Sequence, residues 1–376
     1  MKGSVRQRSK GSYQIRYEAP PDGTGKRKYL SETVKGNKKD AERVLRERLA
    51  AIENGGYVAK HKETVKEFMQ RWLNTYASTN VTLRTLQGYR GYIERYLDST
   101  IGPVALQNLT PRHIQGVYAD MLERGLSNTT VVQLHRIVRE ALSHGVKWGI
   151  LTRNPADATS PPSIQRKQVK MWDIDTIRRF LALVHGTRFG DLYRVAVFTG
   201  LRRSELCGLH WDDVDLMGGK LSVVNTLQRI KGHGLVEGQP KTQKSRRSIA
   251  LPPQVIDVFH SIRGRQIEQR VEAGPLWQNN GYVFTELDGR PIIPDRVTQD
   301  FARIIRNSGL PHLTFHSLRH AHATLLLTAG VHPKIVSERL GHSNIAITMD
   351  IYSHVLPGLQ EQAVLALDQR LSLTQE

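Results

Sequence analysis

The sequence has a single cysteine, Cys207, and no long apolar segment. One cysteine excludes an intrachain disulfide and a zinc ribbon built on cysteine ligands. No apolar run approaches the roughly 18 residues that would indicate a membrane-spanning helix. The first residues, MKGSVRQRSKGSYQIRY, lack the apolar core of a secretion signal. We therefore expect a cytoplasmic protein that has no membrane partner.

Negative charge is also scarce. The chain has 35 Asp and Glu against 54 Lys and Arg, which leaves a formal net charge of +19. Such an excess is typical of a protein that binds nucleic acid, although a basic surface that only aids solubility is the alternative. Aromatic residues are few, at 7%, but hydrophobic residues reach 39%, which is enough for packed cores. A chain of 376 residues predicts two or three domains.

Residues 1–60 predict a small domain made of a three-stranded sheet and one helix. Apolar residues alternate around Tyr13, Ile15 and Tyr17 and again around Tyr29, on either side of a Pro/Gly turn. A helical stripe follows in KKDAERVLRERLAAIENGG. The segment carries fifteen Lys and Arg against seven Asp and Glu. A sheet of this kind can lie in a DNA groove, and the alternative is again a sheet that only aids solubility.

Residues 63–155 predict a bundle of four helices. Four segments have apolar residues at a spacing near 3.6, and each begins at a hydroxyl residue that can cap a helix: Thr64, Thr82, Thr110 and Ser127. Amphipathic helices with short connections form a bundle. Arginines on one side of it would face DNA, although exposed charge alone would look the same.

The segment NPADATSPPSIQRKQVK has three prolines and a basic run, and it predicts a linker over residues 156–170. Residues 171–376 predict a mixed α/β domain, with β-rich stretches around KLSVVNTL and SRRSIALP. Its helices are expected at residues 173–185, 190–199, 202–210, 253–273, 295–308, 316–329, 333–340 and 345–353. The expected fold class is multidomain α+β, mainly α.

The stretch TFHSLRHAHATLLLTAG, residues 314–330, has three histidines and an arginine within seven residues. His316 and His320 are four residues apart on an expected helix, a spacing that can bind one metal ion. Arg319 would share that face, and a guanidinium beside a dication is unfavourable. An imidazole with a guanidinium suits a phosphate instead. Polar residues at the start of a helix are the plainer alternative.

A phosphodiester site would also need a second arginine, a nucleophile and an acid for the leaving group. Arg202 in FTGLRRSEL lies at an expected helix N-terminus, where anions are favoured. Lys241 in QPKTQKSRRSIALP precedes an expected strand. His342 in ERLGHSN and Tyr352 in TMDIYSHV complete the set.

These motifs, in this order, resemble those of the tyrosine recombinases of the phage integrase family. The resemblance covers residues 60–376 and is specific in TGLRRSEL, PKTQKSRRSIAL, HSLRHAHAT and LGHSNIAITMDIYSHV. It implies a SAM-like helical core-binding domain before a catalytic domain. Residues 1–60 resemble, more loosely, the arm-type DNA-binding domain of integrases from mobile elements.

The resemblance implies seven active-site residues, and they are Arg202, Glu205, Lys241, His316, Arg319, His342 and Tyr352. Tyr352 would attack a phosphodiester and form a 3′-phosphotyrosine, while His316 accepts its proton and Lys241 protonates the departing 5′-oxygen. Arg202 and Arg319 would clamp the phosphoryl oxygens, His342 would add a hydrogen bond and Glu205 would brace the site.

Three nearby residues need a separate interpretation. Arg203 is the alternative for the first catalytic arginine, but the T-G-x-R spacing favours Arg202. His320 and His322 have no required catalytic role in the family, and we expect them to be structural or backbone-contacting.

The resemblance also implies partners. The expected DNA-contacting residues are Arg16, Lys26, Arg27, Lys28, Arg84, Arg90, Arg136 and Arg246. We expect a homotetramer on double-stranded DNA with core-type and arm-type sites, accessory bending or directionality proteins, and neither metal nor cofactor. The tail, residues 356–376, would pack on a neighbouring subunit or fold back on its own. The expected setting is the nucleoid of a bacterial host.

The function implied is integration, and also excision, of a phage or other mobile element. One alternative is a recombinase that resolves chromosome dimers, whose usual form lacks an arm-binding domain. A second alternative is a DNA-binding regulator that does not cut, which would have no need for Lys241 or Tyr352.

Overall fold

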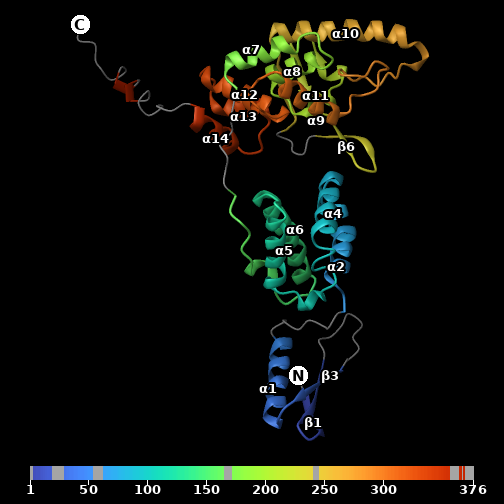
Figure 1. Ribbon diagram of the computed structural model, residues 1–376, viewed down its shortest axis with the longest axis vertical. Coiled ribbons are helices and arrows are strands. Elements are labelled where there is room, and N and C mark those ends of the chain that lie inside the picture. Colours follow the sequence, from blue (N-terminus) through green and yellow to red (C-terminus); the bar gives the residue numbers. More distant parts are fainter. Residues whose placement is uncertain are drawn as a thin grey trace. The chain divides into compact units, whose positions relative to one another are not determined.

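The computed structural model describes residues 3–18, 29–53, 62–164, 172–239, 245–355, 364–365 and 367–368. The chain divides into two compact units, residues 1–166 and 167–376 (Figure 1). No helix in these described ranges is both long and apolar enough to cross a membrane.

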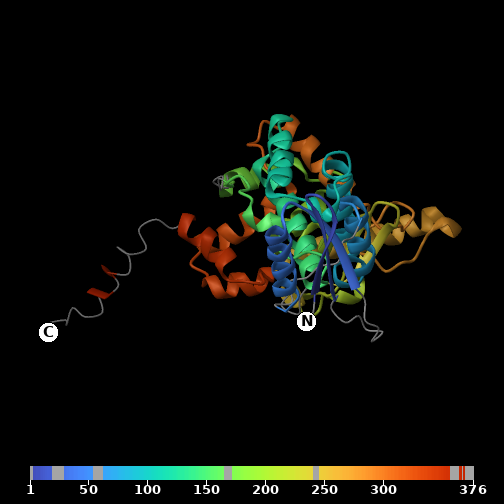
Figure 2. The ribbon, with the colours of Figure 1, turned by 90° about the horizontal axis from the view of Figure 1, so that it is seen from below.

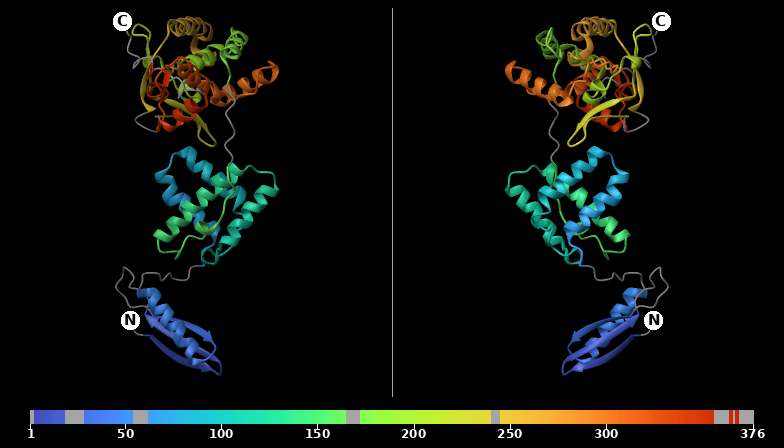
Figure 3. Two further views of the ribbon diagram at one scale, coloured as in Figure 1. Left: turned by 90° about the vertical axis from the view of Figure 1, so that its left-hand side faces the viewer. Right: turned by 90° about the vertical axis from the view of Figure 1, so that its right-hand side faces the viewer.

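The first unit begins with a three-stranded antiparallel sheet in the order β1-β2-β3. Its strands are β1 (Gly3–Ser9), β2 (Ser12–Glu18) and β3 (Tyr29–Lys35). Helix α1 (Lys38–Glu53) packs along one face of this sheet (Figures 2 and 3). Ile15 and Tyr17 are buried beneath it because alternate strand residues point to the same face. The expected sheet and helix are confirmed.

The same unit continues with the expected helices. They are α2 (Val65–Trp72), α4 (Leu83–Tyr96), α5 (Pro111–Glu123) and α6 (Asn128–Lys147). The side chains of Thr64, Thr82, Thr110 and Ser127 each accept a hydrogen bond from the backbone three residues ahead, so that all four predicted caps are confirmed. Phe68, Trp72 and Leu134 belong to the core that the helices share.

A π-helical segment, Leu73–Ala77, follows α2 and leads into the short helix α3 (Ser78–Asn80). The sequence did not indicate this π-helical segment, because one extra residue in a single turn hardly changes the spacing of the apolar residues. Trp72 stacks on Tyr89 with ring centroids 5.5 Å apart and donates a hydrogen bond of 2.9 Å to Nδ1 of His144.

The second unit contains all eight expected helices. They are α7 (Ile174–Leu183), α8 (Gly190–Thr199), α9 (Arg203–Cys207), α10 (Pro253–Ala273), α11 (Pro294–Asn307), α12 (Phe315–Thr328), α13 (Pro333–Leu340) and α14 (Ala346–Val355). The helix expected to reach residue 210 ends at Cys207 instead. Gly208 is the C-cap residue and leaves the helical range with φ −98° and ψ 9°, as a weak helix former readily does. A Cβ there would lie 2.7 Å from the backbone nitrogen of Leu227, so the position requires a glycine.

Two small sheets complete this unit. The first has the order β4-β5-β8, with β4 (Val214–Asp215), β5 (Lys220–Val223) and β8 (Arg247–Ala250). The second is the hairpin of β6 (Thr226–Ile230) and β7 (Gly234–Gly238). The expected β-rich stretches contain β5, the first two residues of β6, and β8. Strand β7 was not expected, since its two glycines and exposed side chains give little strand signal.

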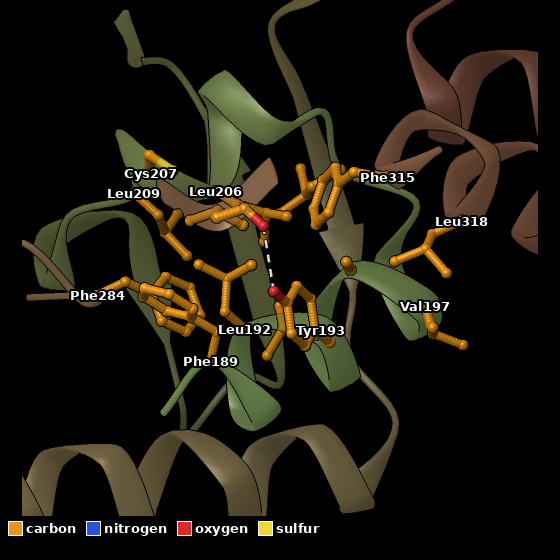
Figure 4. Packing of buried hydrophobic residues seen from close by; sticks show 14 of the residues in the cluster. Phe189, Leu192, Tyr193, Val197, Leu206, Cys207, Leu209, Phe284, Phe315 and Leu318 are labelled. Atoms are coloured by element: carbon orange, nitrogen blue, oxygen red, sulfur yellow. Dashed lines mark hydrogen bonds between the residues drawn. The ribbon is translucent and has the colours of Figure 1, made fainter. Parts of the chain in front are cut away.

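Helix α8 runs through the main core of the second unit. Tyr193 packs among aromatic rings, with its centroid 6.4 Å from that of Phe189 and 6.1 Å from that of Phe315 (Figure 4). Its hydroxyl donates to the Val297 carbonyl at 3.1 Å and to Asp300 at 2.9 Å. This packing immobilises α8 and therefore fixes where its C-terminal end lies.

Candidate active site

The turn after α8 places the first arginine motif. Gly200 has φ +66°, in the left-handed region that glycine adopts without strain. A Cβ there would lie 2.6 Å from Leu340 and 2.7 Å from the ring of His322. A glycine is therefore required, and the reversal that it allows sets Arg202 at the N-terminus of α9.

Arg202 is fixed by the helix that it begins. Its backbone nitrogen donates to Oε2 of Glu205 at 2.9 Å, and its Nη1 donates to Oε1 at 2.6 Å. Its Nη2 donates to the carbonyl of Gly341 at 3.1 Å. About a third of the Arg202 side chain (34%) remains exposed, whereas only 2% of the Glu205 side chain is exposed. The guanidinium can therefore meet a ligand while its carboxylate partner stays buried.

Arg319 approaches the same turns from α12. It is buried, and its Nη1 donates to the carbonyl of Gly200 at 2.8 Å while Nη2 donates to the carbonyl of Leu340. Burial, with a smaller contribution from the charge of Arg202, lowers the pKa of Arg319 to about 9. The side chain still carries its charge at neutral pH. Two guanidinium groups thus converge on the turns that follow α8 and α13.

A third arginine, which the motifs did not single out, contacts the same carboxylate. Arg247 donates to Glu205 from Nη1 at 3.2 Å and from Nη2 at 3.0 Å. Burial would raise the pKa of Glu205, but the hydrogen bonds and charge of Arg247 and the charge of Arg202 outweigh it, so that the pKa is lowered. Glu205 is therefore ionised and shared by two arginines.

The histidines of the site are neutral at physiological pH. Burial of part of the side chain, followed by the nearby charges of His320 and Arg319, lowers the pKa of His316 to about 4, although the residue as a whole is exposed. Burial and the charges of Arg319 and Arg202 lower the pKa of His342 to about 3. A neutral imidazole can accept a proton, which a protonated one cannot.

The two histidines are held differently. Nδ1 of His342 lies 2.8 Å from the hydroxyl of Thr348, a fully buried residue of α14. If that hydroxyl donates, the opposite ring nitrogen of His342 carries a hydrogen that it can give to an anion. His316 and His320 contact each other edge to face, with ring centroids 4.9 Å apart.

His322 has a structural position, as expected. Its Nδ1 lies 2.9 Å from the carbonyl of Val197, and its Nε2 accepts a hydrogen bond of 3.2 Å from Arg339. These contacts connect α12 to the end of α8 and to α13. Arg203, the alternative for the first catalytic arginine, is instead engaged with Asp295 at 3.3 Å and Thr298 at 2.5 Å.

Several candidate residues lie outside what the structure describes. They are Lys26, Arg27, Lys28 and Lys241, together with the side chain of Tyr352. The backbone of Tyr352 belongs to α14, which packs on α12 and α13 (Figure 1). Ile351 anchors that helix on the small cluster that includes Leu327 and Leu340.

The other expected DNA-contacting residues are exposed. They are Arg16, Arg84, Arg90, Arg136 and Arg246. Arg16 lies over the ring of Tyr29, 4.8 Å from its centroid, on the sheet face opposite α1. Arg246 donates to the side chain of Gln239. Exposure is necessary for a DNA contact but does not identify one.

Among the described residues, no group of three or more His, Cys, Asp or Glu side chains is arranged to hold a metal ion. The arrangement of charged arginines, neutral imidazoles and one buried carboxylate instead suits a phosphate group, whose oxygens accept hydrogen bonds from guanidinium forks.

Comparisons with known proteins agree with this chemistry. The model of the phage integrase family matches residues 174–358, and the model of the phage integrase N-terminal SAM-like domain matches residues 64–122. A XerC-like tyrosine recombinase of Caldanaerobacter subterraneus subsp. tengcongensis is 30% identical over 349 residues, covering 88% of this chain and 89% of that protein. The ICEBs1 integrase of Bacillus subtilis is 27% identical over 287 residues, covering 76% and 77%.

A solved structure has the same fold. The Tn1549 transposon integrase, in complex with a circular intermediate DNA, superposes with a TM-score of 0.70 at 23% identity and covers 81% of this chain and 99% of that one. Together, the family models and the relative at 30% identity establish the assignment. The chain belongs to the phage integrase family and is a tyrosine site-specific recombinase.

Proposed function

We propose that this recombinase is the integrase of a phage or integrative element, which cuts and rejoins DNA at attachment sites to insert and excise that element. The observation that carries the proposal is the convergence of Arg202 and Arg319 beside neutral His316 and His342. The ICEBs1 and Tn1549 relatives, both from mobile elements, support this role over chromosome-dimer resolution. The XerC-like relative is the reason to keep that alternative.

Tyr352 is the proposed nucleophile. A tyrosine has an ordinary pKa of about 10, so forming its phenolate at pH 7 costs roughly 4 kcal/mol. His316 is neutral in the free protein and can accept the phenolic proton as the oxygen attacks phosphorus. The P–O bond to the 5′-oxygen breaks as the bond to tyrosine forms, and Lys241 protonates the departing oxygen.

Charge stabilisation comes from the arginines. Arg202, Arg247 and Arg319 carry three positive charges and Glu205 one negative charge, which leaves +2 in a largely buried cluster. A phosphodiester carries one negative charge and its pentacovalent transition state about two. This net charge favours the transition state over the ground state, which is the requirement for catalysis.

The DNA partners follow from the domain plan. We propose that residues 1–60 bind arm-type sites, that residues 63–155 bind core-type sites, and that the catalytic domain follows the linker at 156–170. The Tn1549 integrase was solved with DNA, and the net charge of +19 fits the same partner here. We propose further that the active assembly is a homotetramer helped by accessory bending or directionality proteins.

Trapping the protein–DNA bond tests this function. A DNA duplex nicked near the crossover loses the short strand once cleaved, so an active recombinase accumulates as a covalent adduct that denaturing gels resolve. We expect an adduct with the wild-type protein and none with Tyr352→Phe, which should still bind unbroken DNA within a few fold. Cleavage by Tyr352→Phe would mean that another residue is the nucleophile. Absence of any wild-type adduct would favour the non-cleaving regulator.

A further inference from the structure

Arg247 occupies a position that the proposed chemistry does not by itself require. Its side chain is 6% exposed, against 34% for Arg202, so Arg247 is the less accessible of the two arginines that bind Glu205. It shares both oxygens of the Glu205 carboxylate with Arg202. We infer that Arg247 is a positioning residue for the strand-cleavage reaction, acting through Glu205 and the α13 turn on the two catalytic arginines; this inference rests on the proposed function.

The first route runs through the shared carboxylate. Glu205 is buried and ionised, and it accepts from Arg202 at Oε1 and from Arg247 at both oxygens. If Arg247 were absent, Arg202 would be the one cation left on this buried carboxylate among the residues that the structure describes. Arg202 would then be drawn toward Glu205 and away from the phosphoryl oxygens, because a buried charge strongly retains its last partner.

The second route runs through the turn after α13. Nε of Arg247 donates to the carbonyl of Arg339 at 2.5 Å. The next two carbonyls along the chain, of Leu340 and Gly341, are those that accept from Arg319 and Arg202. Arg247 thus connects strand β8 to residues 339–341, the backbone segment whose carbonyls orient both catalytic guanidinium groups.

Arg246, directly before it, provides a matched comparison. Successive residues of an extended segment point to opposite sides, and Arg246 is exposed and bonded to Gln239 rather than to Glu205. Replacing Arg246 removes the same charge from the same segment without touching Glu205 or the α13 turn.

The test compares two DNA substrates that differ in charge at the scissile phosphate. One carries the normal phosphodiester and the other an uncharged methylphosphonate, which presents one fewer anionic oxygen to the arginines. Single-turnover rates of adduct formation are measured with excess wild-type protein, Arg247→Met, Arg247→Lys and Arg246→Ala. A variant that is partly misfolded forms the adduct more slowly by the same factor on both substrates. The ratio of the two rates therefore reports only how the arginines are oriented toward the scissile phosphate.

For Arg247→Met we expect the phosphodiester rate to fall about 10- to 100-fold, by analogy with the loss of residues that orient the ligands of a catalytic metal. We expect the methylphosphonate rate to change by less than about threefold, since a misdirected cation matters little to a neutral centre. Arg247→Lys keeps the positive charge but not the paired N–H donors of the guanidinium, so its phosphodiester rate should fall less than that of Arg247→Met but stay below that of the wild type. Arg246 is itself an expected DNA contact, so Arg246→Ala should lower both rates by the same factor and leave their ratio unchanged.

An equal fall on both substrates would overturn the inference, and so would a phosphodiester rate that does not fall. If Arg247→Met does not fold, Arg247→Lys must still slow the phosphodiester selectively, or the inference fails. These outcomes differ from failure of the proposed function, in which the wild-type protein itself forms no adduct.

Discussion

His322 illustrates how a single buried side chain can make stability depend on pH. Burial, followed by the charge of Arg339, lowers the pKa of His322 to about 4. Both ring nitrogens are already bonded, one to a carbonyl and the other to a guanidinium hydrogen. Protonation would place two cations against each other, so the folded protein resists it.

The consequence is a loss of stability in mild acid. Above pH 6.5 the ring is neutral in both the folded and the unfolded chain, and the full contribution to stability is present. As pH falls from 6.5 toward 4, only the unfolded chain takes up the proton. Between pH 7 and pH 5, His322 should therefore remove about 2 kcal/mol from the free energy of unfolding of the catalytic unit.

The change that tests this is His322→Asn, followed by urea unfolding at both pH values. Asparagine does not titrate, so the variant should be less stable at pH 7 but should lose about 2 kcal/mol less than the wild type on going to pH 5. We compare the loss in free energy of unfolding from pH 7 to pH 5 in the wild type with the same loss in the variant. The packing effect of the substitution and the contributions of the other histidines cancel in this comparison. Equal losses in both proteins would contradict the assigned pKa.

The turn between α8 and α9 shows how one local geometry assembles the site. Gly200 must adopt a left-handed conformation, its carbonyl accepts from Arg319, and the residue two positions later is Arg202. The space beside it is filled by Leu340 and the His322 ring. Local backbone preference and long-range packing therefore require a glycine at the same position.

We predict that Gly200→Ala lowers the free energy of unfolding by about 2–4 kcal/mol, from left-handed strain together with overpacking. Gly264→Ala is the control, because Gly264 lies in helix α10 and a Cβ added there would meet no atom within 4 Å. That substitution should be neutral or should stabilise by up to about 1 kcal/mol, since alanine favours a helix over glycine. Thermal or urea unfolding measures both. Equal effects at the two sites would refute the role given to the turn.

The net charge of the 376-residue chain, +19, determines how DNA binding should respond to salt. Each phosphate neutralised by a basic side chain releases counterions, and the entropy gained from this release falls as the salt concentration rises. Affinity for an attachment-site duplex should fall roughly 10³–10⁵-fold between 50 and 200 mM salt.

Replacing one phosphate contact, for example with Arg90→Ala, should reduce the slope of log affinity against log salt by about one. Fluorescence anisotropy with a labelled duplex measures the slope. Thr79→Ala, at an exposed uncharged position of the same unit, should leave the slope unchanged. A wild-type slope near zero would argue against extensive phosphate contact.

The C-terminal tail should matter for assembly rather than for binding. Val364, Leu365 and Leu367 are apolar and more than half exposed, so their burial would require another surface. We expect that a chain ending at Val355 binds DNA within a few fold of the full chain but forms fewer tetramers on junction DNA. Native gels and sedimentation would report this. Intact tetramers and coordinated cleavage after truncation would show that the tail does not bridge subunits.

Much of the architecture was accessible from the sequence because local interactions encode it. Helix caps such as Thr64 and Thr110 bond to backbone only three residues away, and apolar periodicity is set within a few turns. The motif order identified the family in the same way, since each motif is a short local string. The boundaries of the helices were therefore predicted closely, apart from the π-helical segment and the early end of α9.

The tertiary structure alone decided which charged residues meet. Arg246 and Arg247 are indistinguishable in the string SRRS, yet only Arg247 reaches Glu205, 42 positions earlier in the chain. His322 likewise contacts Val197 across 125 positions. Such pairs depend on how α8, α12, α13 and β8 pack. A short sequence pattern specifies the direction of a side chain within its own element, but it does not specify which distant element packs against it.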